Sequence, residues 1–193
     1  MWYINIQINI MGLLSVSICI IRIRMGGKFM ERDKALSTDG FIITQRLMKG
    51  FQYGSISSDM NGCGWIAAYN LFRGLGYSYN YEQVYEEMNK ILPYKGMLGT
   101  PTKTLRNYIK SKNISITNTI WKKPTIKASK QCKVGIIRYL EGFEPHYVTF
   151  LRIDEDKFRF LNAKEGKEDY ILTMEQFIKI HCWFPLVRTM MVM

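Results

Sequence analysis

The sequence predicts an α+β domain, with helices in its first half and an antiparallel sheet in its second. Apolar residues recur at helical spacing in three segments between residues 64 and 112, whereas from residue 133 onward they alternate with polar ones. The 193-residue chain is long enough for one domain with a core, and its 47% hydrophobic and 22% charged content is typical of soluble globular proteins. We therefore expect one domain built from both kinds of element.

The first of the three helical segments covers residues 64–75. Its apolar residues recur every three or four positions, and Gly76 follows it, as a helix C-terminus prefers. The small Ala67 and Ala68 allow close packing, so we expect this helix to be buried. Before it, residues 31–57 mix short apolar and polar runs, which indicates an extended or loosely helical lead-in.

Two more helices follow in the sequence. The second is expected at about residues 80–91, with Asn80 as its N-cap and acidic residues in its early turns. The third is expected at about residues 101–112, where Thr100 is a candidate cap and Pro101 falls in the first turn.

The second half of the chain predicts strands. Alternating segments rich in aromatic and β-branched residues are KVGIIRYL (133–140), HYVTFLRI (146–153) and KFRFLNA (157–163). Three acids at 154–156 separate the last two strands, and we interpret them as a hairpin turn. A cation site is the weaker interpretation, because no spaced oxygen ligands follow them.

The C-terminal region predicts a short helix and a closing strand. Thr173 and Gln176 form the pattern of a capping box, which opens a helix at 174–180. The stretch CWFPLVRTM (182–190) is expected to form a strand, and its Pro185 favours an edge position in the sheet.

The first 29 residues allow three interpretations. The apolar run 2–21 could be a signal peptide or a membrane anchor, although polar residues interrupt it and its positive charges follow rather than precede it. The codons of Gly26-Gly27 could instead form a ribosome-binding site ahead of Met30. Residues 1–29 would then be a non-native leader and residues 30–193 the single cytoplasmic domain. If residues 1–29 are genuine, we expect a secreted or membrane-anchored protein.

Charge and cysteine content narrow the classes of function. The net charge is +11, but the basic residues are scattered and no nucleic-acid-binding motif accompanies them, so a solvated basic surface is the preferred interpretation. The two histidines and the four cysteines, at positions 19, 63, 132 and 182, include no CxxC pair or clustered metal ligands. We expect reduced thiols in a reducing compartment, with no metal or other cofactor.

Cys63 is the first candidate catalytic residue. It lies between Gly62 and Gly64, where the first apolar helix is expected to begin. The partial positive charge and unpaired N–H groups of a helix N-terminus favour a thiolate, and the Cys63 N–H could donate to an oxyanion. Glycines on either side would leave room for a substrate backbone. The alternative is that Cys63 is a small buried apolar residue.

A base and an orienting residue follow later in the sequence. His146 opens one predicted strand, and Asn162 ends the strand that pairs with it through the acidic turn, so the two should lie close together. Asn162 could then accept a hydrogen bond from the imidazole and fix its tautomer. The alternatives are a structural histidine and an ordinary turn asparagine. His181 needs no catalytic role, since a protonated histidine complements a helix C-terminus.

The stretches NGCGWIAAYN, PHYVTFL and FRFLNA resemble the papain-like cysteine peptidases. They are most similar to the compact bacterial branch that includes the double-glycine leader peptidases of bacteriocin exporters. The resemblance covers about Asp59 to Asn162. It implies a papain-like fold, a peptide or protein substrate, and roles for Cys63 as nucleophile, His146 as general base and acid, and Asn162 as orienter.

The chain departs from this family at the oxyanion hole. The family carries a glutamine six positions before its cysteine, where this chain has Ser57. Asn61 is the candidate donor in its place, with a helix cap as the alternative. Losing one such donor can cost about 10² or more in rate. The leading prediction is a thiol hydrolase of peptide or related amide bonds. An inactive binding module and an acyl or peptidyl transferase on the same fold remain open.

Overall fold

The structure, a computed structural model, describes residues 34–164 and 166–193. The alternatives for residues 1–29, and Met30 as the start of the domain, concern residues outside those described. Within the described part of the chain, no helix has the length and apolar character that crossing a membrane requires. Residues 35–193 form a single unit.

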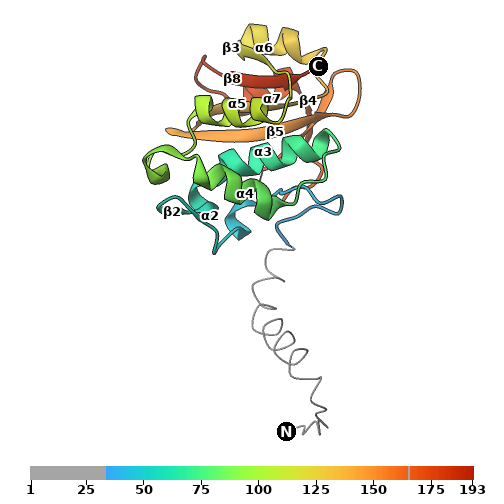
Figure 1. Cartoon of the computed structure of the whole chain (residues 1–193). Helices are drawn as coiled ribbons and strands as arrows, with labels where there is room; N and C mark the ends of the chain where they lie inside the picture. Colours follow the sequence, from blue (N-terminus) through green and yellow to red (C-terminus); the bar gives the residue numbers. More distant parts are fainter. Residues whose placement is uncertain (1–33, 165) are drawn as a thin grey trace, which may run out of the picture. The chain divides into compact units, whose positions relative to one another are not determined.

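Six antiparallel strands form the main sheet, in the order β3-β8-β4-β5-β6-β7 (Figure 1). Their bounds are Thr117–Ile120 (β3), Val134–Glu141 (β4), Glu144–Arg152 (β5), Lys157–Leu161 (β6), Ile171–Thr173 (β7) and Arg188–Val192 (β8). A separate small hairpin pairs β1 (Gln52–Tyr53) with β2 (Ile56–Ser57). The predicted α+β class is confirmed.

Helices pack on both faces of this sheet. They are α2 (Ser58–Asn61), α3 (Cys63–Gly74), α4 (Tyr81–Lys90), α5 (Thr102–Ser111), α6 (Lys122–Ser129) and α7 (Met174–His181), with 3₁₀ turns η1 (Gln45–Leu47) and η2 (Pro93–Gly96). Successive residues of β4 point to opposite faces. Ile136 packs with α3, α4 and α5, whereas Ile137 packs in the cluster that contains α7. The sheet is therefore covered on both sides.

Helix α3 lies at the centre of one layer, alongside β5 (Figure 1). Every residue from Cys63 to Phe72 is buried, as the small alanines and the apolar periodicity predict. The Thr149 hydroxyl of β5 donates to the Ala67 carbonyl of α3 at 2.9 Å, which joins the helix to the strand. This contact holds the start of α3 close to the N-terminal half of β5, where His146 lies.

Several predicted boundaries are confirmed. Asn80 caps α4, because its side chain accepts a hydrogen bond from the Gln83 N–H at 2.7 Å. Thr173 and Gln176 form the expected capping box at the start of α7. Gly76 follows α3 with φ +82°, the left-handed conformation that favours glycine after a helix.

Other boundaries differ from the prediction. The expected edge strand at 182–190 is wrong, because β8 begins at Arg188 and lies between β3 and β4, with Pro185 outside it. Helix α5 begins at Thr102 with Pro101 as its N-cap residue, and Thr100 does not cap it. The Thr100 hydroxyl instead bonds the Tyr53 hydroxyl at 3.0 Å. Strand β5 begins two residues before His146, so His146 does not open it.

Candidate active site

Cys63 is the first residue of α3, but a short helix, α2, comes directly before it. Gly62 separates the two helices and interrupts the hydrogen bonding between them. The first N–H groups of a helix have no acceptor within that helix, so those of Cys63 and Gly64 have none within α3. The Asp59 carbonyl, which a continuous helix would offer to the Cys63 N–H, instead accepts from Gln45 Nε2 at 3.3 Å. The N–H groups next to the sulfur are therefore positioned to bind an anion.

The two glycines beside Cys63 are required by packing. A Cβ at Gly62 would lie 2.5 Å from the Ser58 carbonyl oxygen, and one at Gly64 would lie 2.2 Å from the Thr100 hydroxyl. The protein's own atoms thus occupy the space that was expected to admit a substrate backbone. Close contact with α2 and with Thr100, two residues before α5, accounts for both glycines.

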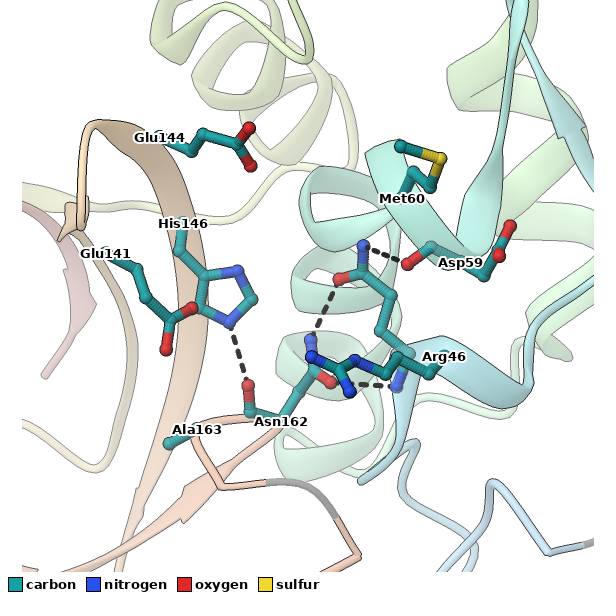
Figure 2. Close-up of a pocket in the computed structure, with 9 residues that line it drawn as sticks. Arg46, Asp59, Met60, Glu141, Glu144, His146, Asn162 and Ala163 are labelled. Carbon is teal, nitrogen blue, oxygen red and sulfur yellow. Dashed lines mark hydrogen bonds between the residues drawn. The ribbon is translucent and has the colours of Figure 1, made fainter.

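His146 projects from β5 and is half-buried. Its Nε2–H donates to the backbone carbonyl of Asn162 at 2.9 Å, which leaves the Nδ1 atom facing the helical side of the pocket (Figure 2). Burial lowers the pKa of His146, but a hydrogen bond with the Cys63 side chain and the charge of that side chain outweigh it. Together with smaller contributions from the Asn162 carbonyl and the Glu141 carboxylate, they raise the pKa to about 9. The imidazole is therefore held as a cation beside the thiol.

Asn162 lies next to His146, as the predicted hairpin requires, but it makes the contact through its backbone. Its φ of +62° is in the left-handed region that asparagine tolerates, and its carbonyl points to the imidazole. Its side chain points away, toward η1 (Figure 2). There Oδ1 accepts from the Gln45 N–H at 3.0 Å and Nδ2 donates to Gln45 Oε1 at 3.2 Å. The expectation that the Asn162 amide itself orients the imidazole is thus corrected.

Asn61 lies outside the pocket. Its Nδ2 donates to the Gly96 carbonyl at 2.8 Å, so its amide is held by η2 and is not directed at the space where an oxyanion would form.

Gln45 is the residue that sequence reasoning missed. Its side chain joins Asn162 to the Asp59 carbonyl in front of α3. It lies earlier in the chain than the family's glutamine, so spacing from Cys63 gave no signal for it.

A pocket of about 320 Å³ opens beside His146 (Figure 2). Its lining residues come from η1, α2, the β4–β5 hairpin and the end of β6, and they are Gln45, Arg46, Asp59, Met60, Glu141, Glu144, His146, Asn162 and Ala163. Cys63 does not line it and is only 8% exposed. The pocket therefore opens beside His146, and Cys63 lies behind its lining.

The other described thiols and the second histidine have different surroundings. Burial raises the pKa of both Cys132 and Cys182 to about 12, which keeps these thiols protonated. His181 bonds the Tyr170 hydroxyl through Nε2 at 2.8 Å, and burial lowers its pKa. The expected protonated histidine at the end of α7 is therefore corrected to a neutral one. Among the described residues, no three or more potential ligands form a metal site.

Comparison with known proteins gives no match to a family model and none to a curated protein. The resemblance to papain-like peptidases therefore rests on the residues and on their arrangement.

Proposed function

We propose that the protein is a papain-like thiol hydrolase that cleaves a peptide or a related amide bond. The observation that carries this proposal is the position of His146, which is held by the Asn162 carbonyl and lies close enough to Cys63 for that side chain to raise its pKa. The chain order of these residues, and a nucleophile at the start of a buried central helix, support it further. Activation of a thiol by a neighbouring base is what nucleophilic catalysis requires.

In the proposed mechanism, the Cys63 thiolate attacks the substrate carbonyl carbon. The N–H groups at the start of α3 stabilise the oxyanion that forms. His146 then gives its proton to the leaving amine, which departs and leaves an acyl-enzyme. The neutral imidazole next takes a proton from water, and the resulting hydroxide attacks the acyl carbon and releases Cys63.

We assign the second oxyanion donor to Gln45 rather than to Asn61. The Gln45 amide lines the pocket, and its Nε2 makes a long 3.3 Å contact that a substrate oxygen can replace. Gln45→Ala should lower kcat by about 10² or more, because an oxyanion donor acts in the transition state. Asn61→Ala should lower it much less, since Asn61 bonds η2. Equal losses in kcat for the two variants would contradict the assignment.

Alkylation tests the proposed nucleophile directly. At neutral pH, iodoacetamide should modify Cys63 much faster than Cys132 or Cys182, which serve as internal controls in the folded protein because burial keeps them protonated. His146→Ala should slow the reaction of Cys63 at neutral pH, because the variant removes the base beside the thiol. Similar rates at the three thiols would rule out an activated nucleophile.

A binding module without turnover is the second candidate. It is favoured by the small exposed fraction of Cys63 and by its absence from the pocket lining. Incubation of the protein with a defined peptide mixture, followed by mass spectrometry, separates the two. New peptide ends that disappear in Cys63→Ala support the hydrolase, whereas retained peptides with no new ends support the binding module. An added amine that becomes attached to the new C-termini would show acyl transfer through the same intermediate.

A further inference from the structure

We propose that the tip of the β4–β5 hairpin binds the part of the substrate that flanks the scissile bond, and that it selects a peptide with basic and apolar side chains. The inference rests on the proposed function and names the substrate class for that site. The tip surface consists of Glu141, Phe143, Glu144, Trp183 and Phe184.

The apolar part of the tip surface is exposed but ordered by its own contacts. Phe143 is 90% exposed, Trp183 59% and Phe184 40%. Trp183 meets Phe143 edge to face, with centroids 6.2 Å apart, and meets Phe184 at 5.6 Å. Its indole N–H donates to the Gly142 carbonyl at 3.0 Å, which ties the residues after α7 to the hairpin turn. Exposed aromatic groups held in place are typical of a binding surface.

The charged part of the tip surface faces the pocket. Glu141 and Glu144 are paired across the hairpin, and both line the pocket from the same side as His146 (Figure 2). Neither is in an ion pair with another described residue. Arg46 lines the pocket from the opposite wall. The two carboxylates can therefore pair with cationic groups of a substrate that approaches along the hairpin.

The net charge of +11 does not cancel this local preference. Interactions between exposed charges are screened over about 8 Å at physiological salt. A cationic side chain at the hairpin therefore responds mainly to Glu141 and Glu144, which lie on its side of the pocket, with Arg46 on the opposite wall. Aromatic groups next to carboxylates thus fit a peptide that carries both apolar and basic residues.

The distance from the tip surface to His146 indicates which part of a bound peptide would contact the tip. Phe143, in the hairpin turn, precedes His146 by three residues, and three residues of extended chain span at most about 10 Å. An extended peptide covers this distance with about three residues. The tip surface should therefore contact the substrate about three residues from the bond that Cys63 attacks.

Cleavage of a mixture of synthetic tetradecapeptides that contains all residue types tests this inference. With the full chain, mass spectrometry should show which residues lie near the cleaved bonds. Lys or Arg, together with Leu or Phe, should be enriched about three residues from those bonds, by about tenfold or more over their frequency in the mixture. The enrichment should be lost in the double variant Phe143→Ser/Glu144→Gln. It should persist in Ile153→Ser/Glu155→Gln, a matched control at the tip of the next hairpin, whose side chains are likewise exposed.

The outcomes separate this inference from the proposed function. Cleavage that depends on Cys63 but shows no enrichment, or an enrichment that survives in the tip variant, overturns the inference alone. If no peptide is cleaved and Cys63 is not selectively alkylated, the proposed function fails. Binding of the same peptides to Cys63→Ala, measured by Trp fluorescence, then decides the inference: a preference for basic and apolar peptides that needs Phe143 supports it. Equal binding of acidic peptides, or self-association of the chain that Phe143→Ser abolishes, overturns it.

Discussion

At the scale of single residues, the proposed chemistry depends on the protonation of His146. Its pKa is raised to about 9 mainly through Cys63, since burial acts in the opposite direction. Cys63→Ala should therefore lower the pKa of His146 to its ordinary value of 6.5 or below. The chain has two histidines, so NMR titration of the ring protons measures the change directly, with His181 as the internal control. An unchanged pKa in the variant would show that Cys63 does not act on His146.

The same shift predicts how stability depends on pH. The pKa of His146 in the folded protein lies above its ordinary value, so the contribution of its protonated form to stability is complete below about pH 6.5. It is lost as the pH rises through about 9. Urea unfolding between pH 6.5 and 9.5 should show this loss in the native protein, and a smaller slope should appear in Cys63→Ala.

Tyr139 gives a second prediction at the scale of residues. Its ring packs edge to face against His146 at 5.9 Å, but its buried hydroxyl has no hydrogen-bond partner among the described residues. Tyr139→Phe keeps the ring and removes this unpaired group, so the free energy of unfolding should rise by about 1 kcal/mol. Tyr147→Phe is the matched control and should lower it by about 1 kcal/mol, since the Tyr147 hydroxyl donates to the Thr100 carbonyl. Destabilisation by Tyr139→Phe in urea unfolding would contradict the account.

The candidate site could be predicted only in part from the sequence. The proposed nucleophile and base follow from local chemistry, because Cys63 begins an apolar helix and His146 lies on an apolar strand. Which group of Asn162 meets His146 depends on a positive φ after β6, and sequence spacing does not determine that angle. Gln45 reaches the pocket only because the chain before α2 folds back against the end of β6.

At the scale of elements, strong local signals and the β5–β6 hairpin were predicted, whereas the places of strands that pair over long distances in the sequence were not. The caps of α4 and α7 follow from side chains that bond neighbouring backbone groups, so residues a few positions apart suffice to predict them. Strand β3, whose residues are mostly exposed, and the three-residue β7 carry no clear alternation. The interior place of β8 depends on pairing with strands far away in the sequence, which its Pro185 obscured.

Gly64, at the start of α3, allows a prediction about how tightly this helix packs against its neighbours. Gly64→Ala places a Cβ 2.2 Å from the Thr100 hydroxyl, so the helix or the chain before α5 must move. We expect a loss of about 1–3 kcal/mol in the free energy of unfolding. Gly74→Ala, at the other end of α3, meets a flexible Leu151 side chain and should cost less, because alanine also improves helix propensity. Equal losses in urea unfolding for the two variants would show that the contact with Thr100 is not tight.

At the scale of the whole molecule, the order of strands in the sheet predicts which backbone hydrogen bonds open last. Strands β4 and β5 pair on both sides and are covered by helices on both faces, whereas β3 and β7 are edge strands. Hydrogen exchange under native conditions should be slowest in β4 around Ile136 and Ile137, and markedly faster in β3 and β7. Mass spectrometry of peptic fragments measures both in one experiment. Comparable exchange in β4 and β3 would contradict the central role of the β4–β5 pair.

The interior position of β8 also has a consequence for synthesis of the protein. Strand β8 follows every other strand in the sequence, yet it fills the gap between β3 and β4. While the ribosome is still adding these residues, the β4 edge has no partner and is open to pairing with other nascent chains. Cys63, His146 and Asn162 have all been translated by then, but the sheet that supports β5 is incomplete. The six-stranded sheet is therefore complete only after translation reaches β8, the last strand in the sequence.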